Sequence, residues 1–150
     1  MPTVFYHGEA GYAIMTLRDL NQYRDMLREQ AKTERLLESL RSAAEPGAQI
    51  ITGMPHAPGY QDKLGNLAAE IADLSRELKS VEDRIRRRKP EIVKFVHSIS
   101  DSQTRLIFHF RFLRGMSWGQ IAALIGGGNN AGSVKNTCYR FIKKYQKKII

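Results

Sequence analysis

Residues 117–145, SWGQIAALIGGGNNAGSVKNTCYRFIKKY, decide the fold of this chain. Ser117 and Gln120 have the spacing of a capping box, in which two side chains satisfy backbone groups left unpaired at a helix start. We expect a short apolar helix to follow, then a turn at 126–130, where glycine and asparagine tolerate the left-handed backbone angles of a sharp turn. Ser133 is predicted to cap a second helix. Two helices joined in this way form a helix-turn-helix.

The second of these helices is predicted to be apolar on one side and polar on the other. Its apolar side chains recur at helical spacing: Val134, Cys138, Phe141 and Tyr145. The remaining positions are rich in hydrogen-bond donors for phosphates and base edges, as a DNA recognition helix requires. The predicted DNA-binding residues are Ser133, Lys135, Asn136, Tyr139, Arg140, Lys143 and Lys144. No Asp or Glu follows Asp101, whereas ordinary surface helices mix both signs of charge.

Charge is distributed unevenly along the 150 residues, whose formal net charge is +9. Residues 1–83 contain 9 Lys and Arg against 13 Asp and Glu, whereas residues 84–150 contain 15 against 2. Clustered cations gain free energy by releasing the counterions that condense on phosphates. We therefore expect the partner to be double-stranded DNA, bound by the C-terminal part of the chain.

The N-terminal part is predicted to form two long helices. Thr16 and Asp19 fit a capping box that opens a helix running to about Ala44. A second helix carries a strict heptad repeat of apolar residues, typical of a coiled coil: Leu64, Leu67, Ile71, Leu74, Leu78, Val81 and Ile85. Its partner is either the first helix folded back or a second copy of the chain, which would form a homodimer through residues 64–85. Between the helices, the Ile50–Ile51 pair is expected to pack back on one of them.

We therefore predict an all-α protein, in which a long helical hairpin or coiled coil precedes a helix-turn-helix domain. The expected parts are a flexible arm at 1–15, the hairpin at 16–89 with a loop at 45–61, and the DNA-binding domain at 90–150. Pro90 marks the boundary, because proline disfavours the helical conformation of the preceding residue and suits the first position of a new helix. In the second domain, residues 106–113 hold six apolar side chains and predict a helix buried on most sides.

A run of basic residues precedes this proline. It is either a solvated helix end that complements the helix dipole or a second stripe of phosphate contacts. Its residues are Arg86, Arg87, Arg88 and Lys89.

Residues 105–122, RLIFHFRFLRGMSWGQIA, resemble the DNA-binding region 4 of bacterial sigma factors. Together with Gly53-Met54-Pro55-His56 and Gly65-Asn66-Leu67-Ala68, they resemble the small phage-encoded, sigma-like regulators of late transcription of the RinA or ArpU type. The resemblance covers roughly residues 16–145. It implies binding to phage or prophage promoter DNA and modulation of transcription by host RNA polymerase. Gln120 departs from the usual Glu, and the turn is about two residues longer than in ordinary region 4.

Two other functions fit the same pattern. A phage DNA-packaging protein, the small terminase subunit, also joins a helix-turn-helix to an oligomerising helical segment. An adaptor that binds RNA polymerase through its helical surface would contact DNA only incidentally. An enzyme is not expected, because metal-dependent phosphoryl transfer needs clustered carboxylates and the basic half holds only Glu91 and Asp101.

No metal or other cofactor is expected either. The four histidines lack the spacing of zinc ligands, and the glycine triplet lacks the Lys-Ser/Thr pair of a phosphate-binding P-loop. The single cysteine, Cys138, is predicted to be an inert core thiol, and it indicates a reducing compartment, the bacterial cytoplasm. No apolar stretch of about 18 residues predicts a membrane span, and the N-terminus lacks the pattern of a signal peptide.

Overall fold

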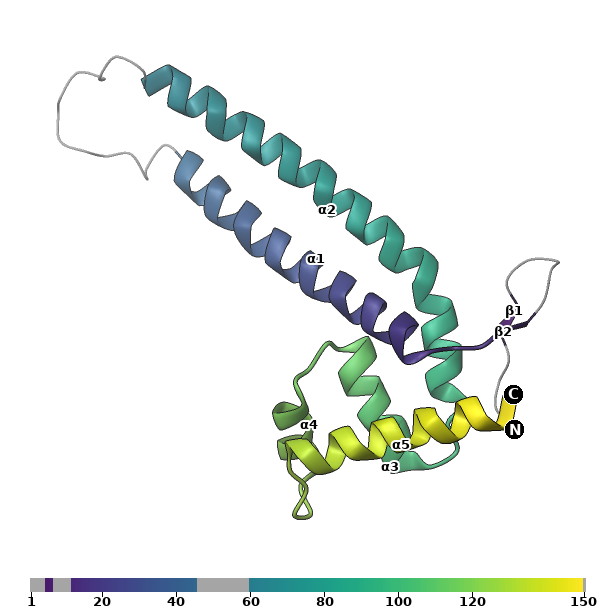
Figure 1. The fold of residues 1–150 in the computed structure, drawn as a ribbon. Helices are drawn as coiled ribbons and strands as arrows, with labels where there is room; N and C mark the ends of the chain where they lie inside the picture. Colours follow the sequence, from purple (N-terminus) through teal and green to yellow (C-terminus); the bar gives the residue numbers. More distant parts are fainter. Residues whose placement is uncertain (1–4, 7–11, 46–59, 150) are drawn as a thin grey trace. The chain divides into compact units, whose positions relative to one another are not determined.

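The computed structural model describes residues 5–6, 12–45 and 60–149. Its elements are β1 (Phe5–Tyr6), β2 (Tyr12–Ala13), α1 (Leu17–Ala44), α2 (Tyr60–His97), α3 (Ser102–Phe108), the π-helix η3 (His109–Leu113), α4 (Trp118–Ile125) and α5 (Ala131–Ile149). The two strands are two residues long and pair antiparallel. Everything else in Figure 1 that carries regular structure is helical, which confirms the predicted all-α class with a long helical hairpin.

The chain divides into two compact units. The hairpin unit comprises Arg28–Arg84, and the C-terminal unit comprises Met1–Leu27 and Ile85–Ile150. The first turns of α1 and the last turns of α2 thus belong with the helix-turn-helix rather than with the hairpin. The loop at 46–59, including the expected packing of Ile50 and Ile51, lies outside the described residues.

In the hairpin unit, the parts of α1 and α2 run antiparallel, side by side (Figure 1). Leu37 of α1 and Val81 of α2 are each 1% exposed, and the Glu29 carboxylate lies 3.5 Å from the Arg84 guanidinium at the surface. Within one chain, α1 is therefore the partner of the heptad seam, the apolar repeat of α2 from Leu64 to Ile85. Most of that seam is only half-buried: Leu64, Leu67, Ile71, Leu74 and Leu78.

The start of α1 has the predicted capping box. The backbone N–H of Thr16 donates to the Asp19 carboxylate at 3.1 Å, and the Asp19 N–H donates to the Thr16 hydroxyl at 3.1 Å. Directly before it, Ile14 and Met15 pack against the core, so the predicted flexible arm does not extend over these two residues. Their apolar side chains gain more from burial than the backbone loses in freedom.

The predicted helix break at Pro90 is wrong, because α2 runs through this residue to His97. An interior proline removes one backbone hydrogen bond and costs about 3 kcal/mol. Within the next two turns Ile92, Phe95 and Val96 are fully buried, and each contributes about 1.5 to 3 kcal/mol. Their burial outweighs the cost and keeps the helix continuous.

Phe108 of α3 lies at the centre of the core of the C-terminal unit. Its ring is 5.9 Å from that of Phe95 in α2, 5.5 Å from Phe112 in η3 and 5.3 Å from Phe141 in α5, centroid to centroid. The Asp101 side chain caps α3 by accepting the Thr104 N–H at 2.9 Å. Of the six apolar side chains at 106–113, five lie in this core or pack against it, as expected of a helix buried on most sides, whereas Leu106 is 47% exposed.

We predict that Phe108→Ala lowers the free energy of unfolding by about 3 to 5 kcal/mol, because it leaves a cavity among three other aromatic rings. Urea denaturation followed by circular dichroism measures the loss. Leu106→Ala on the same helix is the control and is expected to cost far less, since nearly half of this side chain is already in water. Equal losses for the two variants would contradict this description of the core.

Candidate nucleic-acid interface

The helix-turn-helix is formed by α4 and α5, which pack against each other in the C-terminal unit. The predicted capping box opens α4: the Ser117 N–H donates to Gln120 Oε1 at 3.0 Å, and the Gln120 N–H donates to Ser117 Oγ at 3.2 Å. Ile121 and Ala122 of α4 are buried against the rest of the core. The short helix is therefore a fixed support for α5.

Three successive glycines form the turn between these helices. Gly126, Gly127 and Gly128 have φ angles of 67°, 64° and 77°, a region that other residues rarely adopt. The side-chain amide of Asn129 then donates to the Gly126 carbonyl at 2.8 Å. The turn is thus closed by its own residues before α5 begins.

The predicted cap of α5 is misplaced by one turn. The helix begins at Ala131, and Asn130 occupies the capping position that was assigned to Ser133. The Ser133 N–H donates to Asn130 Oδ1 at 2.9 Å, and the Asn130 N–H donates to Ser133 Oγ at 2.9 Å. Asn and Ser are equally good caps, so the earlier of the two satisfies the helix start and lengthens the helix.

One side of α5 is buried, as its periodicity predicts. Val134, Cys138 and Tyr145 lie in the core, and Phe141 is half-buried. Ile142, which the sequence analysis did not include, is buried beside them. Burial raises the pKa of the Cys138 thiol to about 12, in agreement with an inert core cysteine.

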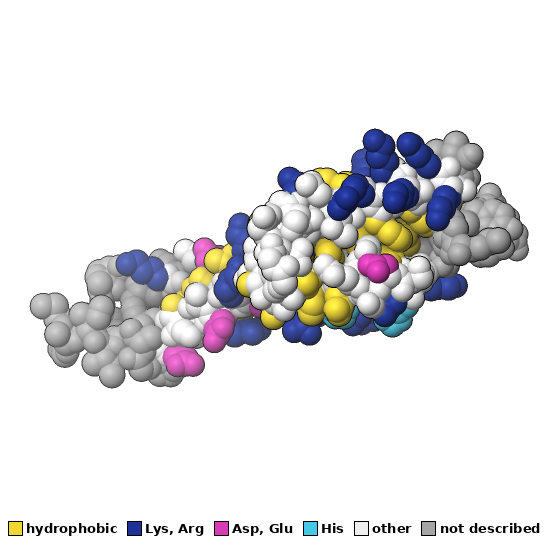
Figure 2. All heavy atoms as spheres, turned by 90° about the horizontal axis from the view of Figure 1, so that it is seen from below, with side chains coloured by type: hydrophobic (Ala, Val, Ile, Leu, Met, Phe, Trp, Pro, Cys, Tyr) yellow, Lys and Arg dark blue, Asp and Glu magenta, His cyan; other side chains and the backbone are white. Residues whose placement is uncertain are grey.

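The opposite side of α5 carries the predicted DNA-binding residues. Ser133 is half-buried in the cap of the helix, whereas the other six side chains are exposed. Lys147 and Lys148 are exposed as well and extend the basic face by a turn. Helical spacing from Lys143 and Lys144 could have identified them. Figure 2 shows Lys and Arg side chains gathered into a patch on one face of the molecule.

An alternation of cations and aromatic rings fixes one edge of this face. The Arg111 guanidinium of η3 lies 4.1 Å from the Trp118 ring centroid, and Trp118 packs edge-on against Tyr139 with centroids 6.1 Å apart. The Lys135 ammonium lies 5.6 Å from the Tyr139 ring centroid. Trp118 thus packs between helices and contacts the half-exposed Tyr139 of α5.

The second predicted set of phosphate contacts lies on a different helix, α2. Arg86, Arg87 and Lys89 are exposed there. Arg88 is half-buried, and its guanidinium lies 3.5 Å from the Asp19 carboxylate and 3.4 Å from the Glu91 carboxylate. These two ion pairs neutralise Arg88 within the unit, so it is the member of the set least suited to contact DNA.

The described residues offer neither a metal centre nor a membrane span. In the parts that the structure describes, His, Cys, Asp and Glu side chains do not gather in groups of three that could hold a metal ion. Over the same residues, every helix is too short or too polar to cross a membrane.

Comparison with known proteins adds no family to this description. No family model, curated protein or solved structure matches the chain. The resemblance to phage sigma-like regulators stays a prediction. The geometry and charge of α5 are the basis of the function proposed below.

We predict that Asn130→Ala loosens the first turn of α5, because it leaves the Ser133 N–H without its acceptor. Loss of such a cap costs about 1 kcal/mol. Hydrogen exchange of the Ser133 and Val134 amides, compared with those of α4, measures the fraying. Asn136→Ala, at an exposed interior position of the same helix, should leave the exchange of these amides unchanged. Equal protection in Asn130→Ala and the wild type would contradict the role of Asn130 as the cap.

Proposed function

We propose that this chain is a transcription regulator, encoded by a phage or prophage, that binds promoter DNA through α5 and modulates transcription by bacterial RNA polymerase. The observation that carries the proposal is the outer face of α5. It joins Lys135, Arg140, Lys143 and Lys144 on the second helix of a helix-turn-helix, in a stretch of chain with no carboxylate side chain from 102 to 150. Such a protein acts in the bacterial cytoplasm, where promoters are found.

The charges of the two units support this division of roles. The C-terminal unit contains 16 Lys and Arg against 5 Asp and Glu, whereas the hairpin unit contains 8 against 10. A phosphate backbone attracts the first unit and weakly repels the second. The two units therefore suit different tasks, DNA binding and assembly.

The dimensions of α5 suit the major groove. An α-helix with its side chains is about 10 to 12 Å wide, and the major groove of B-DNA is about 12 Å wide. Asn136 and Arg140 lie one turn apart on the exposed face, and the Arg140 Nε donates to the Asn136 carbonyl at 3.4 Å. These two side chains are the proposed readers of base edges, with the lysines on phosphates.

The half-buried heptad seam supports self-association of the hairpin. Five of its leucine and isoleucine side chains keep part of their surface in water, which a second copy of the chain would cover. A homodimer through residues 64–85 would present two copies of α5, as dimeric helix-turn-helix proteins do on paired half-sites.

The same seam also suits a packaging protein, which would assemble into a ring. Mass measurement in solution separates the two functions. A monomer or dimer supports the regulator, whereas a ring-sized assembly supports the small terminase subunit.

Footprinting on the promoters of the source genome tests the proposal directly. We expect a protected site whose affinity falls with salt, since each phosphate contact contributes about −0.9 to the slope of log affinity against log salt. The four exposed cations among the predicted DNA-binding residues of α5 predict a slope steeper than about −2. A shallower slope, or no protection above random DNA, would instead favour an adaptor that binds RNA polymerase through protein contacts.

We predict that Arg140→Ala weakens binding to the footprinted site by about tenfold or more, because a bidentate contact to a base is worth about 1 to 3 kcal/mol. Lys135→Ala should weaken binding to specific and random DNA alike. Fluorescence anisotropy with labelled duplexes measures both effects. The control is Arg35→Ala, which removes the same charge from an exposed position of the hairpin unit. If Arg140→Ala and Arg35→Ala bind equally well, α5 does not read DNA.

A further inference from the structure

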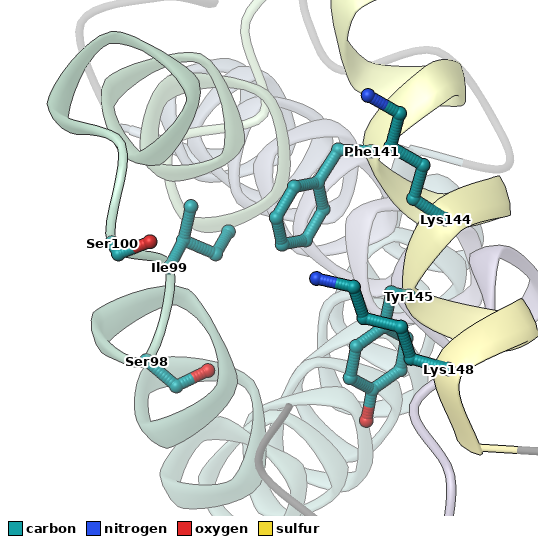
Figure 3. A pocket seen from close by; sticks show the side chains of 7 residues that line it. All are labelled: Ser98, Ile99, Ser100, Phe141, Lys144, Tyr145 and Lys148. Atoms are coloured by element: carbon teal, nitrogen blue, oxygen red, sulfur yellow. The ribbon is translucent and has the colours of Figure 1, made fainter. Parts of the chain in front are cut away.

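A pocket of about 180 Å³ opens beside the buried face of α5, within the C-terminal unit (Figure 3). One wall is the connection between α2 and α3, and the other is the C-terminal half of α5. Phe141 and Tyr145 supply its aromatic surface. The lining residues are Ser98, Ile99, Ser100, Phe141, Lys144, Tyr145 and Lys148.

A lysine and two serine hydroxyls lie on opposite walls of this pocket: the Lys148 ammonium extends toward the serine wall, whereas the Lys144 ammonium points away from it, at the rim (Figure 3). Lys144 and Lys148 lie one turn apart on α5, and Figure 3 shows the serine side chains on the opposite wall. The Ser98 hydroxyl is committed, because it donates to the Phe95 carbonyl at 2.6 Å. In the described part of the chain, the Ser100 hydroxyl makes no hydrogen bond and neither lysine forms an ion pair. The Lys148 ammonium and the Ser100 hydroxyl are therefore available to a ligand in the pocket, and the Lys144 ammonium is available at its rim.

The described carboxylates near the pocket do not neutralise these lysines. Among the residues that the structure describes, none with a carboxylate side chain lines the pocket. The carboxylate that follows in sequence, Asp101, accepts the N–H and the hydroxyl of Thr104 at 2.9 and 2.7 Å. These bonds hold the pKa of Asp101 below its usual value and keep its charge at the start of α3. The described lining thus carries two lysines and no carboxylate side chain, with hydroxyls as further donors.

We propose that this pocket binds a phosphate group, and that in the complex with DNA it holds a phosphate of the backbone. The Lys148 ammonium and the Ser100 hydroxyl, with a second ammonium at the rim on Lys144, match the several acceptor oxygens of a phosphate. Charge-assisted hydrogen bonds of this kind are the strong ones. The volume is below the roughly 300 to 1,000 Å³ of sites for drug-sized ligands, so it suits a phosphate rather than a whole nucleotide. Phe141 and Tyr145 exclude water on one side and strengthen the attraction.

The choice of a backbone phosphate rests on the function proposed above. Lys144 belongs both to the predicted DNA-binding residues and to the pocket, so the pocket continues the basic face of α5. A phosphate held there would fix the position of α5 on the duplex without reading sequence. A free phosphate ion has the same chemistry, and the experiments below separate the two sources.

The first experiment tests the pocket alone, with inorganic phosphate as the probe and the full chain in solution. Titration at constant ionic strength, followed by amide NMR, is expected to give saturable shifts at Ser98–Ser100 in the wild type. Lys148→Gln should abolish them, whereas Lys147→Gln, the same change at an exposed neighbour outside the pocket, should retain them. Equal effects of the two variants, or shifts spread over all of α5, would overturn the proposed pocket.

The second experiment asks whether DNA supplies the phosphate, using a double-mutant cycle with duplex DNA. Ser100→Ala is expected to weaken binding about tenfold in the wild type and in Lys147→Gln, but less than about twofold in Lys148→Gln, because both groups hold one phosphate. Additive losses would exclude a backbone phosphate, and the NMR result would then assign the pocket to the free ion. If the chain binds no DNA at all, the proposed function is overturned. The phosphate titration would still decide whether the pocket binds phosphate.

Discussion

The packing of aromatic rings around Phe108 is the interaction on which the C-terminal unit depends. This one side chain contacts rings from α2, from α5 and from η3, which directly follows it, so these elements share a single fully buried centre. The position of α5 follows from it, because Phe141 meets Phe108 on the buried side of the helix while Arg140 and Lys144 face outward. A change in that centre would move the exposed donors even though none of them touches it.

Much of this arrangement could be predicted from local chemistry. Two capping boxes, Thr16 with Asp19 and Ser117 with Gln120, form as their spacing indicates, because each depends only on residues within one helical turn. The periodicity of Val134, Cys138 and Tyr145 predicted the buried side of α5. The positions left over on the same helix predicted its exposed residues. The assignment of those residues to DNA binding stays a prediction.

Errors arose where a distant contact decides between local alternatives. Pro90 has the signal of a helix break, yet the burial of the residues that follow it keeps α2 continuous. Asn130 and Ser133 are both suitable caps, and the sequence offered no means of choosing between them. The pocket beside α5 could not be predicted at all, because Ser100 and Lys148 are brought together only by the packing of α3 against α5.

Cys138 gives this protein a built-in reporter of its own dynamics. The only sulfhydryl in the sequence lies on the buried side of α5, where a pKa of about 12 keeps the reactive thiolate scarce. A thiol reagent can reach it only when the helix lifts from the core, so the rate of modification counts openings of that helix. In the wild-type chain, the rate of Cys138 modification therefore measures how often α5, the proposed DNA-binding helix, opens.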